Sequence, residues 1–173
     1  MRAWEWFDAA GLVNAEHLVN DGLRDCRNNG GTTWTYNQGI LISALVQLWR
    51  LTGSRAYLDR AHAVATAATT RLVHPGGTIL REPSEPGCDR DQEIFKGVLA
   101  QGLGRLCRAD PAGSAAHRAV LAANAEAVWQ HARALDDGLG LVWSGPPDRV
   151  TPATHASATL LLGEAALLDT PTV

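Results

Sequence analysis

Apolar side chains recur along the chain with the spacing of amphipathic helices. The clearest stripe lies on residues that share one helical face: Tyr57, Ala61, Val64, Ala65, Ala68 and Leu72. A stripe with the helical period of about 3.6 residues predicts a helix that buries this face. We expect the helix to begin after Ser54, a residue typical of N-caps, and to end before His74 and Pro75.

Four more segments follow a helical pattern. Three of them carry apolar stripes. The first stripe consists of Phe95, Val98, Leu99, Gly102, Leu103 and Leu106, and the second of Leu121, Asn124, Ala125, Val128 and Ala132. The third consists of Ala156, Thr159, Leu160, Gly163 and Leu167. The fourth, from Tyr36 to Leu51, is apolar nearly all round, which predicts an inner helix surrounded by neighbours. Only Leu12-Val13 and residues 139–143 are compatible with short strands inside loops. The expected fold class is all-α.

The connections between these helices alternate between short and long. Residues 52–54 and 110–113 form tight turns of helical hairpins. The segments 10–33, 73–90 and 135–151 are much longer than the usual connection of about 2–8 residues between packed helices. In an array of antiparallel helices, this alternation places every long loop at the same end. Long ordered loops on a rigid scaffold are where binding and catalysis concentrate, so we expect function at that end.

Composition and charge exclude several classes of function. Hydrophobic residues make up 46% of the 173 residues and charged residues 19%, which is typical of a globular domain. The net charge is −3 and no run is rich in Lys or Arg, so nucleic acid is not an expected partner. The N-terminus lacks the features of a signal peptide, and no apolar run is long enough to span a bilayer. We therefore expect no membrane partner and, for the chain as written, a cytoplasmic location; an extracellular location stays open for a longer parent protein.

The sequence predicts neither a metal site nor a cofactor. Cys26, Cys88 and Cys107 match no metal-ligand spacing. Reduced thiols and a Cys26–Cys88 disulfide are both open interpretations, while Cys107 fits the apolar core. Five histidines without ligand spacing are expected to be structural or surface residues: His17, His62, His74, His117 and His131. Phosphate-loop and nucleophile-elbow patterns are absent.

Polar and aromatic side chains gather where three helices begin after long loops. These helix starts are residues 33–39, 88–97 and 151–155. Aromatic rings cover the apolar C–H face of a pyranose, while amides, carboxylates and ammonium groups hydrogen-bond its hydroxyls. The mixture therefore predicts a sugar-binding face. Its candidate substrate-binding residues are Trp34, Tyr36, Asn37, Gln38, Asp91, Phe95, Lys96 and His155.

The same side chains also have purely structural interpretations. Four residues in these segments are typical N-caps: Thr33, Thr35, Asp89 and Asp91. Trp34 and Tyr36 are compatible with hydrophobic staples. Lys96 is compatible with a surface ion pair to Glu93 or Asp91 on its own helix. For the four N-cap residues, the two interpretations are about equally favoured.

Two pairs of adjacent polar residues, Asn37-Gln38 and Asp136-Asp137, favour different interpretations: the first favours a function and the second a solvated turn. Asn37 and Gln38 open an otherwise apolar helix, where an unpaired amide is costly to bury, so they favour a function. Asp136 and Asp137 form an acidic pair suited to glycoside hydrolysis. They follow the end of a helix and precede Gly138, however, which favours a solvated turn.

Several short blocks resemble a known family. Residues 34–39 (WTYNQG), 48–53 (LWRLTG), 57–61 (YLDRA) and 95–97 (FKG) are similar to blocks of glycoside hydrolase family 76, the endo-α-1,6-mannanases. Their order and spacing agree over roughly residues 4–165, nearly the whole chain. The resemblance implies an (α/α)6 toroid of six helical hairpins. Within the candidates above, it assigns the substrate face to Tyr36, Asn37 and Gln38, and less directly to Asp91, Phe95 and Lys96.

The resemblance also implies a retaining mechanism. One aspartate attacks the anomeric carbon while its neighbour acts as acid and then base, with the two carboxyl groups about 5–5.5 Å apart. In the family these aspartates are adjacent and precede the Tyr-Asn-Gln-Gly block. No Asp-Asp pair precedes Tyr36 here, and Asp136-Asp137 follows the block. We therefore assign no catalytic residue and expect this chain alone to be inactive.

Together these observations predict about half of a toroid that carries a substrate face without the catalytic pair. One helical domain is expected over residues 1–169, with a tail over 170–173. The expected partners are an α-mannan-type oligo- or polysaccharide and, at the two open flanks of a half toroid, a second copy or a separately encoded N-terminal half. Two alternatives stay open. One is a non-catalytic glycan-binding or scaffold protein, and the other is a sugar 2-epimerase-like toroid that transfers protons through His155 and a second histidine.

Overall fold

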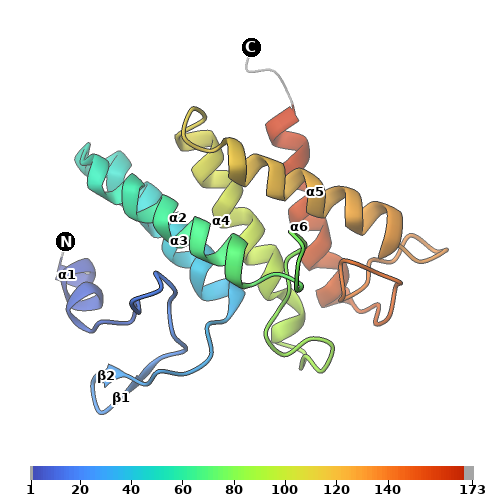
Figure 1. Ribbon diagram of the computed structural model, residues 1–173, viewed down its shortest axis with the longest axis horizontal. Coiled ribbons are helices and arrows are strands. Elements are labelled where there is room, and N and C mark those ends of the chain that lie inside the picture. The colour runs from blue at the N-terminus through green and yellow to red at the C-terminus, as the bar shows by residue number, and fades with distance from the viewer. Residues whose placement is uncertain (1, 170–173) are drawn as a thin grey trace.

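A computed structural model describes residues 2–169 as a helical protein with one small hairpin of strands (Figure 1). The predicted tail over 170–173 lies outside these residues. In chain order the elements are α1 (Arg2–Ala9), β1 (Leu23–Arg24), β2 (Arg27–Asn28), α2 (Thr35–Thr52), α3 (Arg55–Arg71), the 3-10 turn η1 (Gln92–Ile94), α4 (Phe95–Ala109), α5 (Ala115–His131) and α6 (Pro152–Asp169). The predicted all-α class is confirmed, and the five predicted helices are α2 to α6.

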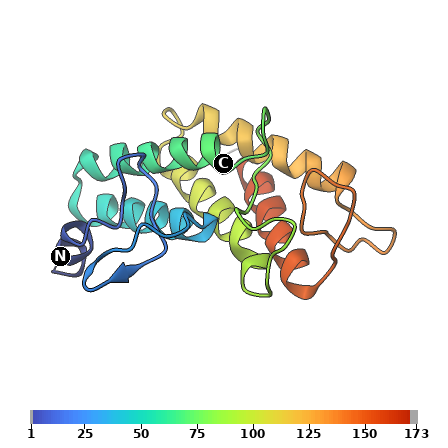
Figure 2. The same cartoon turned by 60° about the horizontal axis from the view of Figure 1, so that its bottom comes forward.

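The helices form two layers. One layer contains α2, α4 and α6, with α4 between the other two, and the second layer contains α3 and α5 (Figure 2). The helices of the first layer all begin after long connections. The two short turns lie at one end of the molecule and the long connections at the other (Figure 1). This arrangement confirms the prediction drawn from the alternating connection lengths.

Backbone geometry explains the short turn between α2 and α3. Gly53 ends α2 with a left-handed φ of 73°, and its N–H donates to the Trp49 carbonyl. Glycine adopts this conformation without steric cost, which is why it is common after the last helical residue. Ser54 occupies the predicted N-cap position of α3, but its side chain makes no capping hydrogen bond.

Glycines allow the helices of the first layer to pack at backbone distance. Gly39 of α2 faces Gly102 of α4, and a Cβ atom on Gly102 would lie 2.5 Å from the Gly39 carbonyl oxygen. Gly97 of α4 faces Ser157 of α6 in the same way, with a Cβ atom 2.6 Å from the Ser157 carbonyl oxygen. The Ser157 hydroxyl also accepts a hydrogen bond of 2.9 Å from the Gly97 N–H. These contacts draw the starts of α2, α4 and α6 together.

The predicted strands are reduced to isolated bridges in the structure. Val13 pairs with Val19, and Leu139 and Gly140 pair with Arg133 and Val150, respectively. The hairpin of β1 and β2 and the helix α1 were not predicted. Strands of two residues are too short to show a two-residue alternation, and α1 buries none of its residues fully.

Two histidines of the second layer are structural, as predicted. His62 of α3 and His117 of α5 stack with ring centroids 5.4 Å apart, and the His62 Nε2 lies 3.1 Å from the Asp110 carboxylate. Burial, together with the neighbouring His62, lowers the pKa of His117. This cluster joins α3 and α5 beside the short turn after α4.

The structure shows the state of the cysteines. All three cysteines are free thiols: Cys26 is exposed, whereas Cys88 and Cys107 are buried. The reduced-thiol interpretation therefore describes this structure, and Cys107 lies in the core as predicted. Among residues 2–169, no helix combines the length and apolarity that crossing a bilayer requires.

Candidate functional site

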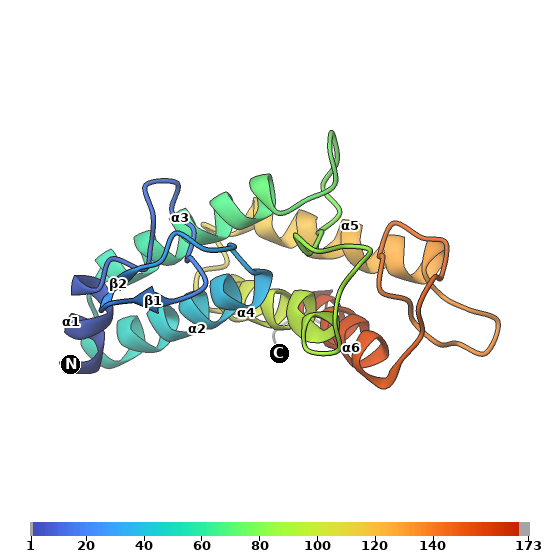
Figure 3. The ribbon, with the colours of Figure 1, turned by 90° about the horizontal axis from the view of Figure 1, so that it is seen from below.

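The starts of α2, α4 and α6 lie at the same end of the molecule, together with the long connections that precede them (Figure 3). Polar groups of the loops and the first turns of the helices therefore share one face, as the sequence predicted. We call this face the rim and define it by residues 34–38, 89–96 and 151–155.

Three aromatic side chains form a cluster on the rim. The Phe95 ring lies 4.3 Å from the Tyr36 ring and 6.0 Å from the Trp34 ring, measured between centroids. Both contacts have tilted or edge-on geometry, which aromatic pairs prefer. The Trp34 indole N–H donates a 2.9 Å hydrogen bond to Asp21. All three rings remain partly exposed, and we call them the aromatic cluster.

The two amides that open α2 have different environments. The Gln38 side chain is fully buried, accepts a hydrogen bond from the Val19 N–H and donates to the carbonyls of Val19 and Trp34. It thus anchors the first long loop to α2. Asn37 is partly exposed, and its Nδ2 atom has no hydrogen-bond partner among the described residues. The Asn37 Nδ2 atom is thus buried and unpaired, whereas the Gln38 amide is engaged, and the glycan-binding role of both stays a prediction.

Lys96 does not occupy the position expected for a rim residue. Its side chain is 1% exposed, its Nζ forms an ion pair with Glu85, and it donates a 2.8 Å hydrogen bond to the Leu141 carbonyl. The ammonium also lies 4.5 Å from the centre of the Trp143 ring. The predicted surface ion pair with Glu93 or Asp91 is wrong, because the long side chain crosses into the interior. Burial lowers the pKa of Lys96.

Sequence patterns gave no signal for Glu82, which is completely buried beneath the rim. Its carboxylate accepts hydrogen bonds from the N–H and the hydroxyl of Thr35, the first residue of α2. Burial raises the pKa of Glu82 to about 7, against the opposing effect of the hydrogen bonds from Thr35 and of the Lys96 charge. A glutamate in a loop rich in proline carries no periodic signature, so only the fold identifies it.

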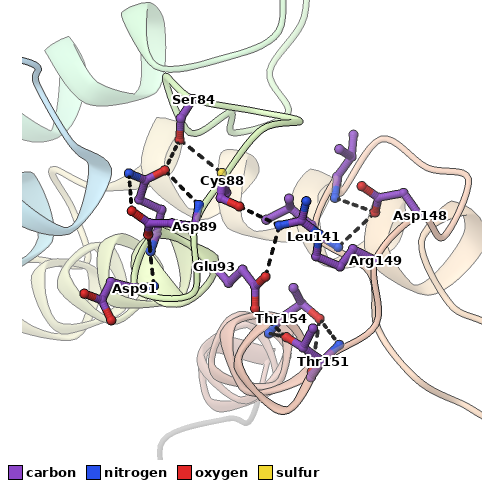
Figure 4. A network of polar contacts seen from close by, with 12 residues as sticks. Ser84, Cys88, Asp89, Asp91, Glu93, Leu141, Asp148, Arg149, Thr151 and Thr154 are labelled. Carbon is purple, nitrogen blue, oxygen red and sulfur yellow. Dashed lines mark hydrogen bonds and ion pairs between the residues drawn. The ribbon is translucent and has the colours of Figure 1, made fainter.

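A second polar network ties the start of α4 to the loop before α6 (Figure 4). Glu93 is buried, and its carboxylate accepts hydrogen bonds of 3.1 Å from Arg149 and 2.6 Å from the Thr151 hydroxyl. Arg149 also donates to the Cys88 carbonyl. Thr151 in turn exchanges hydrogen bonds with Thr154, which fixes the first turn of α6. Both oxygens of the Glu93 carboxylate are therefore engaged in hydrogen bonds within the protein.

The two remaining candidates lie in the open. Asp91 is exposed, and Figure 4 shows its carboxylate directed away from the network. The neighbouring Asp89 accepts the N–H groups of Asp91 and Gln92, which bears out its interpretation as a capping residue. His155 is exposed on the first turn of α6. Their exposure does not test whether Asp91 and His155 bind a glycan, and the substrate-binding role of both stays a prediction.

One flank of α2 is open rather than surrounded, contrary to the pattern of an inner helix. A groove of about 440 Å³ runs between α1 and this flank. Ile40 and Leu51 are 54% and 81% exposed beside it. Its lining is mostly apolar and consists of Ala3, Trp4, Phe7, Val19, Asn37, Ile40, Leu41, Ala44, Gln47, Leu48 and Leu51. We call it the α2 groove.

The acidic pair Asp136-Asp137 forms a solvated turn, as predicted. Asp136 accepts the N–H of Gly138, and Asp137 has a left-handed φ of 64° and pairs with Arg133. Both aspartates are exposed. Within residues 2–169, no group of three or more His, Cys, Asp or Glu side chains is arranged to hold a metal ion.

The sequence model of glycosyl hydrolase family 76 matches residues 1–170. The chain belongs to this family. The family assignment confirms the resemblance drawn from the blocks at residues 34–39, 48–53, 57–61 and 95–97. It also removes the sugar 2-epimerase alternative, which depended on a different family of toroid proteins.

Fungal members of the family are related to the chain over part of its length. The mannan endo-1,6-α-mannosidase DCW1 of Candida glabrata is 30% identical over 118 residues, which cover 64% of this chain and 26% of that protein. The DCW1 protein of Saccharomyces cerevisiae is 30% identical over 111 residues, covering 60% of this chain and 24% of that protein. The chain thus aligns with about a quarter of each of these relatives.

Solved structures extend the similarity to nearly the whole chain. The Lin0763 protein of Listeria innocua has a TM-score of 0.80 and 26% identity, covering 98% of this chain and 48% of that one. An inactive variant of the α-1,6-mannanase GH76A of Salegentibacter sp. HEL1_6, in which two consecutive aspartates are replaced, was solved with α-1,6-mannotetraose. It has a TM-score of 0.82 and 26% identity and covers 97% of this chain and 51% of that one. The helical hairpins of this chain correspond to about half of an (α/α)6 toroid.

Proposed function

We propose that this chain supplies the glycan-binding rim of a family 76 hydrolase that acts on α-1,6-mannan. The aromatic cluster is the observation that carries this proposal, because it presents partly exposed rings at the end where α2, α4 and α6 begin. Rings of this kind pack against the apolar face of a pyranose. Asp91 and His155 add exposed polar side chains to the same end, available for hydroxyls.

The acid and nucleophile of the proposed hydrolysis are assigned to a segment outside this chain. Consecutive aspartates occur here once, at Asp136-Asp137, and they form an exposed turn. Retaining hydrolysis needs two carboxyl groups about 5–5.5 Å apart on either side of the glycosidic bond. The solved mannanase that was inactivated at two consecutive aspartates supports such a pair in the family. A non-catalytic glycan-binding role remains the competing proposal, favoured by the same exposed turn.

We expect this chain to bind α-1,6-mannotetraose without hydrolysing it. Replacing Tyr36 by alanine should weaken binding roughly ten- to hundredfold, because the buried face of one aromatic ring is worth about 1.5–3 kcal/mol. Isothermal titration calorimetry measures the affinity, and chromatography of the mixture detects any shorter oligosaccharide.

Trp129 provides the matched control. It is an exposed aromatic residue of α5, in the second layer, so Trp129→Ala should leave the affinity unchanged. Equal weakening by both substitutions would contradict a rim site. Release of mannose or mannobiose by the chain alone would contradict the absence of the catalytic pair, and Asp136→Ala and Asp137→Ala would then identify its source.

The α2 groove is proposed to receive a helix from the complementary half of the toroid. The solved mannanase chain is about twice as long as the part that this chain matches, and an apolar groove beside α2 is where the next hairpin of a ring would pack. Without that half, the exposed Ile40 and Leu51 of different copies are expected to meet, since apolar patches of this kind favour association.

Sedimentation velocity at micromolar concentrations tests the groove. The unmodified chain should form dimers or larger species, and the double substitution of Ile40 and Leu51 by aspartate should shift it to monomer. Leu135→Asp is the control, because Leu135 is fully exposed on a turn remote from α2. An unmodified chain that sediments as a monomer throughout would argue against the groove as a docking surface.

A further inference from the structure

Helix α2 begins without a cap from its own sequence. Its N-cap residue, Trp34, makes no side-chain capping hydrogen bond. A helix start leaves backbone N–H groups without partners inside the helix, and a carboxylate there also interacts favourably with the helix dipole. Glu82 supplies the missing acceptor, because one of its oxygens accepts the Thr35 N–H at 3.3 Å and the other accepts the Thr35 hydroxyl. The cap therefore comes from a loop 47 residues further along the chain.

Charged groups from two elements surround this cap. Lys96 approaches from α4, and Glu85 approaches from the same loop as Glu82; both influence the Glu82 carboxyl electrostatically. Glu85 pairs with Lys96, and its second oxygen lies 3.5 Å from His74. The loop from Leu139 contributes the Leu141 carbonyl and the Trp143 ring, both of which contact Lys96.

The buried thiol of Cys88 also belongs to this cluster. Its interactions with Glu82, Glu85 and Lys96 are electrostatic, and burial raises its pKa. From α2 itself, Thr35 is the group that faces the Glu82 carboxyl. The cluster thus joins the start of α2, the loop over 73–90, the start of α4 and the loop over 139–151. Trp34 and Tyr36 flank Thr35, and Phe95 precedes Lys96. Each ring of the aromatic cluster therefore lies next in sequence to a residue of this buried polar cluster.

We propose that Glu82 is a positioning residue of the rim, which holds Trp34 and Tyr36 in place through Thr35 and transmits its own protonation state to them. This inference rests on the proposed glycan-binding function of the rim. Thr35 lies between Trp34 and Tyr36 in the sequence and is fully buried, so a shift at its N–H or hydroxyl moves both aromatic residues. Glu82 itself has no exposed surface and acts only through Thr35.

A proton on Glu82 changes the hydrogen bonds of the cap. In the ionised form both oxygens accept, one from the Thr35 N–H and one from its hydroxyl. In the protonated form one oxygen becomes a donor, so the bond to the hydroxyl reverses and the negative charge at the start of α2 disappears. Because burial raises the pKa of Glu82 to about 7, the two forms interconvert near neutral pH.

Protonation of Glu82 also makes the stability of the fold depend on pH, and the raised pKa fixes the direction of this dependence. An exposed glutamate has a pKa of 4.5, whereas Glu82 in the folded chain keeps its proton up to about pH 7. The folded state therefore binds more protons than the unfolded state between these values. The contribution of Glu82 to stability is complete below pH 4.5 and is lost as the pH rises toward 7. Glu82→Gln, which retains one acceptor and one donor, should remove this dependence.

Nuclear magnetic resonance of the full chain between pH 5.5 and 8.5 tests the inference directly. The Trp34 indole N–H, assigned by its loss in Trp34→Phe, and the Tyr36 amide serve as reporters. Both should follow one titration with a midpoint near pH 7, and Glu82→Gln should abolish it while the rest of the spectrum is retained. Thr35→Val, which keeps the backbone donor and removes the hydroxyl, should reduce the amplitude.

Two controls make the outcome specific. His74→Gln removes the nearby imidazole, whose pKa is lowered by burial, and should leave the step near pH 7 in place. Persistence of the step in Glu82→Gln, or its absence in the unmodified chain, would overturn the proposal. Calorimetry with α-1,6-mannotetraose separates it from the proposed function, with Glu82→Ala expected to weaken binding roughly tenfold. A clear titration without any glycan binding would refute the proposed function while leaving the cap and its proton in place.

Discussion

Replacing Gly39 by alanine is expected to lower the free energy of unfolding by about 3 kcal/mol or more. A Cβ atom at this position would lie 2.6 Å from the Leu99 Cα atom and would also meet the Val98 carbonyl. Both neighbours are backbone of α4, so relief requires α2 and α4 to separate. That separation would loosen the packing of Gly102 and the starts of both helices. Urea unfolding followed by circular dichroism at 222 nm measures the change.

Gly163 of α6 is the matched control for this substitution. It is also a helical glycine, but a Cβ atom there would find nothing within 4 Å. Gly163→Ala should therefore stabilise the chain by up to about 1 kcal/mol, since alanine is the better helix former. If Gly39→Ala were neutral or stabilising as well, the close approach of α2 and α4 would be refuted.

Replacing Lys96 by methionine is expected to cost about 3–5 kcal/mol of stability, because it removes one partner of a buried ion pair and leaves the other uncompensated. The Glu85 carboxyl group, whose side chain is 1% exposed, would lose its partner in the interior. The Leu141 carbonyl would also lose the hydrogen bond from the ammonium. Urea unfolding at pH 7 measures the loss, and the midpoint of the transition should move accordingly.

A double variant distinguishes a charge effect from a packing effect. Lys96→Met combined with Glu85→Gln removes both charges of the ion pair and should recover much of the lost stability. Arg133→Met is the control, since it breaks an exposed ion pair with Asp137 and should change stability by no more than about 0.5 kcal/mol. A loss for Lys96→Met no larger than this control would contradict the buried pair.

The layers of the fold follow from features that the sequence displays. The apolar stripe from Tyr57 to Leu72 and the alternation of short and long connections predict antiparallel helices with all long loops at one end. Each of these features depends on neighbours in the chain, which is why they are readable without a structure. The shared end of α2, α4 and α6, and with it the location of the rim, was predictable for the same reason.

Residues with long side chains were predicted less well. Lys96 follows Phe95 in a polar segment at a helix start, a context typical of surface residues, yet its ammonium lies inside the molecule. The direction of a four-carbon side chain depends on what packs against the helix, and Glu85 and Trp143 come from two other loops. Similarly, the sequence favours a function for Gln38 because a buried amide needs a partner, but it does not identify that partner. The structure shows that the Gln38 amide bonds to the backbone of Val19.

The sequence by itself determined the five helices α2 to α6, the end at which α2, α4 and α6 begin and the family of the chain, because periodicity, turn residues and the block from Trp34 to Gly39 are local in the chain. Only the tertiary structure decided which polar side chains are exposed and which are engaged in hydrogen bonds or ion pairs within the protein. Glu82 caps α2 and Lys96 is buried because segments distant in sequence enclose them, and the cost of removing a charge from water forces each to find a partner there. The resemblance predicted open flanks for a half toroid, but an apolar pattern does not record whether a neighbour is present, so only the structure shows that α2 borders one of these flanks.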